Sequence, residues 1–93
     1  MQLATLTIRL QIPQSRSLKS KRQVISGIKD RLKNKFNISI AEVADNDLWQ
    51  VATLGIAVVA NQRRFLDQVL DQVENYIASR PEVVILDSEK VYY

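Results

Sequence analysis

Basic side chains dominate residues 15–36, which read SRSLKSKRQVISGIKDRLKNKF. This segment holds eight Lys and Arg residues and one acid, Asp30. Ammonium and guanidinium groups bind phosphate oxygens, so a row of them can follow the backbone of a nucleic acid. The first 40 residues hold nine bases and one acid, whereas the remaining residues hold four bases and nine acids. This asymmetry permits an anionic partner, and the basic segment is the first candidate for its binding surface.

A helix over this segment would separate the bases into two groups. Apolar residues recur at helical spacing and define a stripe that faces a core: Leu18, Ile25, Ile28, Leu32 and Phe36. Arg22, Lys29 and Lys33 fall on one flank of the stripe, and Arg31 and Lys35 fall on the other. We therefore predict a nucleic-acid-binding surface made by Arg16, Lys19, Lys21, Arg22, Lys29 and Lys33. In the alternative explanation, the methylene stems of these side chains only cover the apolar edge of the helix.

Three bases at the start of this helix need a counter-charge. Arg16, Lys19 and Lys21 lie near the N-terminal end, where the helix dipole is already positive. An anion bound at the free N–H groups of the first turn would supply that charge. Alternatively, Asp45 and Asp47 would neutralise these bases from within the protein, because the predicted sheet brings their turn to the same end.

Catalytic chemistry finds little support in the sequence. The chain has no histidine and no cysteine, which removes the commonest general base, the commonest metal ligand and any thiolate site. An acylphosphatase-like site would need glycines in the loop after the first strand, and PQSRSLKS has none. The acids Glu42, Asp45 and Asp47 lack the spacing of a calcium loop, and a turn built from Asx side chains explains them. We therefore expect no enzymatic activity, no cofactor and no metal site.

Periodicity and turn signals predict the elements that position these residues. Alternation of apolar and polar residues indicates strands, and apolar residues at helical spacing indicate two helices. The predicted order is a strand at 3–12, a helix from Ser17 to near Asn37, a hairpin at 38–60 that turns at 44–47, a helix with Asn61 as candidate N-cap that ends before Pro81, and a strand from 83. In the hairpin, the second strand is expected to span 48–60.

This order of elements is typical of the ferredoxin-like βαββαβ sandwich. We predict an α+β fold in which residues 1–93 form a single domain. Its four-stranded antiparallel sheet would have the order 4-1-3-2, with two helices on one face, and the handedness of crossovers favours this closure. A swapped or differently ordered sheet is the structural alternative.

The open face of this sheet is the second candidate surface. We predict that Trp49, Val51, Ala57 and Val59 form a partner interface, because small and β-branched residues suit packing against another sheet and a tryptophan can anchor such a contact. In the alternative, Trp49 only covers the sheet edge within its own chain. One tryptophan without further aromatics is a poor platform for reading RNA bases from the sheet.

Two motifs carry a resemblance to a known family. RSLKSKRQVI at 16–25 follows the first strand, and FNISIAEVADNDLWQVATLGIAVVAN spans 36–61. With these motifs the chain resembles the YlxP-like family of small bacterial proteins of unknown function over nearly its whole length. The resemblance implies a ferredoxin-like fold and brings no established activity. Members tend to be encoded near translation factors and ribosome-binding factor A, which is an associational pointer toward RNA or ribosomes.

These observations lead to two functional hypotheses. In the first, the chain is a non-enzymatic binding protein whose partner is RNA or a ribonucleoprotein. In the second, it is a protein-interaction module that forms a homodimer through the open sheet face. We expect a cytoplasmic protein without a membrane partner, because the N-terminus lacks a signal-peptide pattern and the longest apolar-rich run, 51–60, is half of what a membrane-spanning helix needs.

Overall fold

The computed structural model describes residues 1–93 and contains four strands and two helices. They follow in the order β1 (Gln2–Gln11), α1 (Leu18–Lys35), β2 (Ser39–Ala44), β3 (Val51–Ala60), α2 (Arg63–Ser79) and β4 (Val84–Tyr92). All neighbouring strands pair antiparallel, and the order across the sheet is β2-β3-β1-β4. Read from the other edge, this is the predicted order 4-1-3-2. The ferredoxin-like fold is therefore confirmed.

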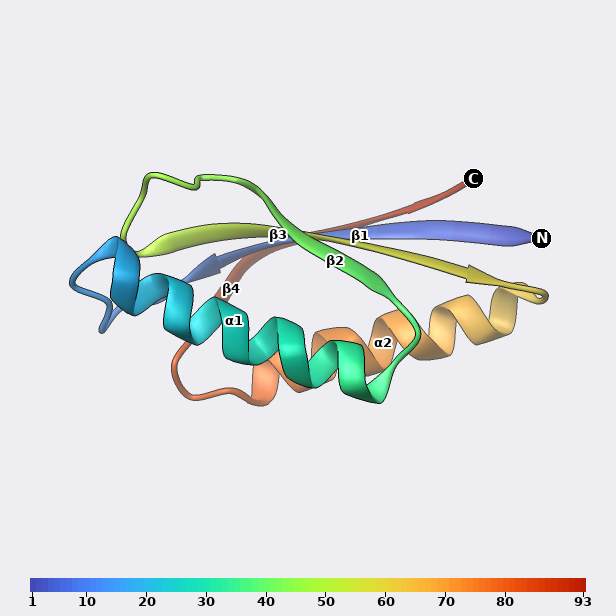
Figure 1. Ribbon diagram of the computed structural model, residues 1–93. Coiled ribbons are helices and arrows are strands. Elements are labelled where there is room, and N and C mark those ends of the chain that lie inside the picture. The colour runs from blue at the N-terminus through green and yellow to red at the C-terminus, as the bar shows by residue number, and fades with distance from the viewer.

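Both helices lie against one face of the sheet, and the opposite face is uncovered (Figure 1). α2 packs across β1, β3 and β4, whereas α1 packs beside β2. The core lies between the helices and the sheet. The even-numbered residues of β1 from Ala4 to Leu10 are buried in it, and the intervening residues point to the uncovered face. Neither helix combines the length and apolar character that crossing a membrane requires.

The N-terminal end of α1 follows from a capping residue in the sequence. Ser17 is the N-cap, as predicted, and its hydroxyl accepts a hydrogen bond from the Ser20 N–H at 3.0 Å. The helix ends where Phe36 adopts an extended conformation and its N–H still reaches the Leu32 carbonyl. Between these ends Ile25, Ile28 and Leu32 are buried, so the apolar stripe faces the core.

Two local predictions are wrong. The second hairpin strand begins at Val51 instead of residue 48, because residues 45–50 form a loop whose conformation is fixed by hydrogen bonds from Lys21 and from the Gln50 side chain. Asn61 is not the cap of α2: Gln62 occupies that position and makes no side-chain capping hydrogen bond. α2 does end before Pro81, and its buried residues are Leu66, Leu70, Val73 and Ile77.

Candidate nucleic-acid interface

Lys21 is buried and bound within the protein. Its Nζ lies 2.9 Å from Glu42 Oε2 and donates to the carbonyl oxygens of Asp45, Asn46 and Val51 at 3.0, 3.3 and 3.1 Å. The side chain has no exposed surface. Four oxygens therefore surround an ammonium group that has three protons. The prediction that Lys21 contacts phosphates is wrong, because this group is closed off from any external ligand.

Sequence patterns explain why these two charged residues meet. Lys21 precedes Ile25 by four residues and Ile28 by seven, so it shares the buried face of α1. In β2, Ile40 and Glu42 are two residues apart and therefore point to the same, helix-covered side of the sheet. Two charged residues at core-facing positions of neighbouring elements satisfy one another when they pair. The spacing in the sequence therefore indicates that Lys21 and Glu42 pair inside the protein. A count of the basic residues in the segment does not reveal this pairing.

Asp45 holds the start of the loop at residues 45–50. Its backbone has φ of 63°, in the left-handed region that aspartate tolerates better than most residues. The Thr53 hydroxyl donates to Asp45 Oδ2 at 2.6 Å, and Arg9 Nε donates to the same oxygen at 3.3 Å. The hydrogen bond from Thr53, assisted by Arg9, holds the pKa of the Asp45 carboxyl below its usual range.

In the internal alternative for the helix start, the expected position of the 44–47 turn is right, but Asp45 and Asp47 are not the acids that pair with its bases. The turn does lie at the same end of the molecule as the start of α1, since Lys21 reaches its carbonyl groups. However, the Asp45 carboxylate pairs with Arg9, and Asp47 forms no ion pair. Arg16 and Lys19 therefore receive no internal counter-charge. The acids of this region also do not gather around a metal site.

The other bases of the predicted surface remain accessible. Ion pairs in the structure involve four bases only, namely Arg9, Lys21, Arg80 and Lys90. Five residues of the predicted phosphate-binding surface remain: Arg16, Lys19, Arg22, Lys29 and Lys33. Four of them are exposed, and Lys29 is half-buried. We call these five residues the basic flank. They present five positive charges without a carboxylate partner.

A hollow marks the middle of the basic flank. It encloses about 450 Å³ between α1 and β2, and Arg22, Ser26 and Lys29 line its helical side. Glu42 and Asn46 are among the residues on its other side. The three helical residues come together because they are spaced three and four apart. The helical spacing of the sequence predicts this grouping.

The bases of the other flank face α2 instead. Lys35 Nζ lies 5.9 Å from the centre of the Tyr76 ring, and Arg31 is close enough to Glu82 to help lower the pKa of that carboxyl, which a hydrogen bond from Arg80 lowers most. Arg31 and Lys35 are nevertheless exposed. The helix thus carries two separate basic edges, one beside β2 and one beside α2.

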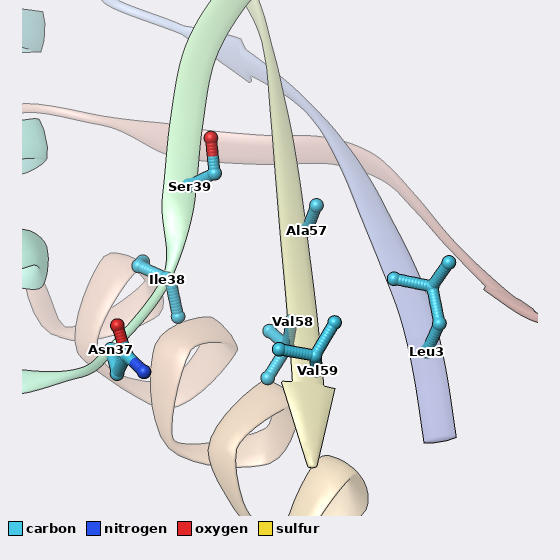
Figure 2. Close-up of a pocket in the computed structure, with 7 residues that line it drawn as sticks. All are labelled: Leu3, Asn37, Ile38, Ser39, Ala57, Val58 and Val59. Atoms are coloured by element: carbon cyan, nitrogen blue, oxygen red, sulfur yellow. The ribbon is translucent and has the colours of Figure 1, made fainter. Parts of the chain in front are cut away.

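The uncovered sheet face contains most of the predicted partner interface. Val51 and Ala57 are half-buried there and Val59 is 52% exposed. Figure 2 shows the end of this face, where Leu3 of β1, Ala57 and Val59 of β3, and Ser39 of β2 belong to neighbouring strands. A hollow of about 280 Å³ lies among these residues and the start of β2.

Trp49 does not belong to that face. Because β3 begins at Val51, Trp49 lies in the loop before the strand, at the opposite end of β3 from Val59. There it borders a hollow of about 350 Å³ together with Arg16 and Gln50. The predicted grouping of Trp49 with the sheet residues is therefore wrong, and of the basic flank Arg16 alone shares its hollow.

Comparison with known proteins identifies the family. Residues 3–90 match the family described as "Protein of unknown function (DUF503)". The chain belongs to the DUF503 family. It is 43% identical over 67 residues to "Uncharacterized protein YlxP" of Bacillus subtilis (strain 168), an alignment that covers 72% of this chain and 73% of the relative. The resemblance to the YlxP-like family is thereby confirmed.

A solved structure with little sequence similarity supports the fold of this chain. A de novo designed protein with a ferredoxin fold, determined by solution NMR, aligns with 99% of this chain and 85% of its own length at a TM-score of 0.59. The two sequences are 13% identical. The likeness therefore shows the shared fold, and a function for this DUF503 chain has to be argued from its own surface.

Proposed function

We propose that this protein is a non-enzymatic, cytoplasmic RNA-binding protein that holds an RNA or a ribonucleoprotein on its basic flank. The observation that supports this proposal is the set of five bases, Arg16, Lys19, Arg22, Lys29 and Lys33, that have no carboxylate partner. Phosphates are the anions whose repeated spacing suits such a row of cations. Contacts of this kind position a nucleic acid without reading its bases.

The position of these bases favours an external anion over mutual compensation. Arg16 and Lys19 flank the start of α1, where the helix dipole is positive and disfavours further positive charge. Arg22 and Lys29 stand one on each side of Ser26 at a hollow that is open to solvent. A bound phosphate backbone would relieve the repulsion at both places at once. The alternative explanation, in which the methylene stems of these side chains only cover the apolar edge of α1, does not account for the absence of carboxylate partners.

The test compares two double variants that remove the same charge from the same helix. Arg22→Gln with Lys29→Gln removes two bases of the basic flank, and Arg31→Gln with Lys35→Gln removes two bases of the edge beside α2. Binding of a fluorescently labelled single-stranded RNA is measured by anisotropy at several salt concentrations. We expect the slope of log affinity against log salt to become less steep by about 0.7 for each phosphate contact removed. The change should therefore be about 1.4 for the first variant and close to zero for the second.

The outcome separates this proposal from general attraction between opposite charges. Equal losses in both variants would mean that only net charge matters and would contradict a specific flank. Affinity that does not change with salt would exclude phosphate contacts as its source. The loss should be similar for RNAs of different sequence, because the contacts are to the backbone.

Self-association through the uncovered sheet face is a second candidate. Three valines on that face, Val43, Val59 and Val91, are 58, 52 and 38% exposed, and Val43 reaches over Gly55, where an added Cβ would lie 2.9 Å from it. Exposed apolar side chains grouped on one face are typical of an interaction surface. Sedimentation of the wild type and of Val59→Glu tests this: a wild-type dimer that the substitution dissociates supports it, and a wild-type monomer at tens of micromolar excludes it.

A further inference from the structure

The loop at residues 45–50 is anchored at both ends. At its start, the carbonyl oxygens of Asp45 and Asn46 accept hydrogen bonds from the buried Lys21 ammonium group. At its end, the Gln50 side-chain amide donates to the carbonyl oxygens of Pro13 and Ser15 at 3.3 and 3.1 Å, and the Gln50 carbonyl accepts from the Ile12 N–H at 2.7 Å. These bonds fix the conformation of the loop from both sides. The residues between these anchors, 47–49, are therefore exposed to solvent on a rigid support.

Trp49, directly before the anchored Gln50, is a large aromatic side chain that this loop exposes. Trp49 is 56% exposed, although a tryptophan gains more from burial than most side chains. It shares a hollow of about 350 Å³ with Arg16, which is within the range of small ligand sites. Arg16 is exposed and forms no ion pair. An exposed aromatic ring on an anchored loop, next to a guanidinium group without an ion pair, matches a nucleotide, which has a flat base and an anionic phosphate.

We propose that Trp49 stacks on an unpaired base of bound RNA while Arg16 and Lys19 contact the adjoining phosphates. This inference rests on the proposed function and makes it more specific, because it assigns the ligand an unpaired nucleotide at the end of the basic flank. Charge favours RNA over a second copy of this chain as the occupant, since a second copy would bring like-charged groups together at Arg16. Duplex RNA keeps its bases stacked inside the helix and offers none to the ring.

The chain contains a single tryptophan, so its fluorescence reports on this site alone. The protein is titrated at low salt with three probes: a short oligouridine, a fully paired RNA duplex and heparin, which is a polyanion without bases. We expect oligouridine to quench the emission of Trp49, and we expect the duplex and heparin to bind without quenching. Quenching by heparin would overturn the inference, because charge alone would then change the emission.

Substitution at Trp49 tests the contribution of the ring to affinity. Trp49→Ala is expected to weaken oligouridine binding, measured by anisotropy, by roughly 5- to 150-fold, and to leave heparin binding unchanged. Trp49→Phe retains a stacking surface and should retain most of the affinity. Circular dichroism of both variants in urea establishes that they fold, which is expected because the side chain is largely exposed.

The proposed function and this inference fail in distinguishable ways. In one outcome, oligouridine binds in a salt-dependent way without quenching Trp49 and with the same affinity for Trp49→Ala. This result would overturn the stacking at Trp49 and leave the basic flank intact as an RNA surface. Absence of binding to oligouridine and to heparin would contradict the proposed function and remove the inference with it. Equal affinity for the duplex and for oligouridine would also overturn the requirement for an unpaired base.

Discussion

Lys21 and Arg22 are adjacent in the sequence and have opposite surroundings. Lys21 has no exposed surface and four oxygen neighbours, whereas Arg22 is exposed, has no ion pair and borders a hollow open to solvent. About 100° of rotation around the helix axis separates the two side chains. The number of bases in a segment therefore overstates the number that a ligand can reach. Their position relative to the core decides which bases serve the fold and which remain for binding.

The largest expected effect comes from removing the buried base. Lys21→Met leaves Glu42 without its partner and three carbonyl oxygens without a donor, so we expect it to lower the free energy of unfolding by about 3–5 kcal/mol. Lys19→Met removes the same chemical group from an exposed position and should change the free energy of unfolding by less than about 0.5 kcal/mol. Urea unfolding followed by circular dichroism measures both. Similar values for the two variants would contradict the division between buried and exposed bases.

A double-mutant cycle sharpens the assignment of Lys21 to Glu42. We expect Lys21→Met combined with Glu42→Gln to be less destabilised than the sum of the single variants, with a coupling energy of about 0.5–3 kcal/mol. The reason is that the second substitution removes the charge that the first leaves unpaired. The same urea experiments on the four proteins give this energy. A coupling energy of zero would mean that the three carbonyl groups, and not Glu42, account for the burial of Lys21.

The exposed side of α1 should accept a change that stabilises the helix. Gly27 lies on that side, and an added Cβ there would have no neighbour within 4 Å. Gly27→Ala is therefore expected to raise the free energy of unfolding by up to about 1 kcal/mol, from helix propensity alone. Thermal or urea unfolding tests this. A destabilised variant would show that this side of α1 packs against something within the protein.

The smallest expected effect concerns the pH dependence of the loop. The pKa of Asp45 is lowered in the folded protein, mainly by the hydrogen bond from Thr53, so its carboxylate stabilises the fold fully above its ordinary pKa of 3.8. That contribution is lost as the pH falls through the lower folded pKa. Asp45→Asn should therefore be less stable than the wild type at neutral pH, and the difference should shrink below pH 3.8. A difference that stays constant down to acid unfolding would contradict the role of the charge.

The fold was predictable because its signals are local and consistent. Alternation in β1, the Ser17 cap and the stop before Pro81 each specify one element, and the order of elements specifies the topology. The start of β3 could not be read in the same way. Residues 48–50 continue the apolar pattern of the strand, but the hydrogen bonds of Lys21 and Gln50 hold the preceding loop in another conformation. Those bonds join residues that are distant in the sequence.

The candidate site was predictable only where helical spacing alone decides it. The spacing of Arg22, Ser26 and Lys29 predicts their common flank, and the structure places them around one hollow. The burial of Lys21 could also be predicted from helical spacing, provided that charged residues are placed on the helix together with the apolar ones. The position of Trp49 beside Arg16 depends on where β3 begins, and no local pattern contains that information.

An NMR titration locates the RNA-binding surface of the protein residue by residue, because each backbone amide and the single indole N–H report separately. We expect that adding single-stranded RNA to the isotope-labelled protein shifts the amides around Arg16, Arg22 and Lys29 together with the Trp49 indole, and leaves the strands of the open sheet face unchanged. Shifts concentrated on Thr5, Val59 and their neighbours on that face, with α1 unaffected, would contradict it.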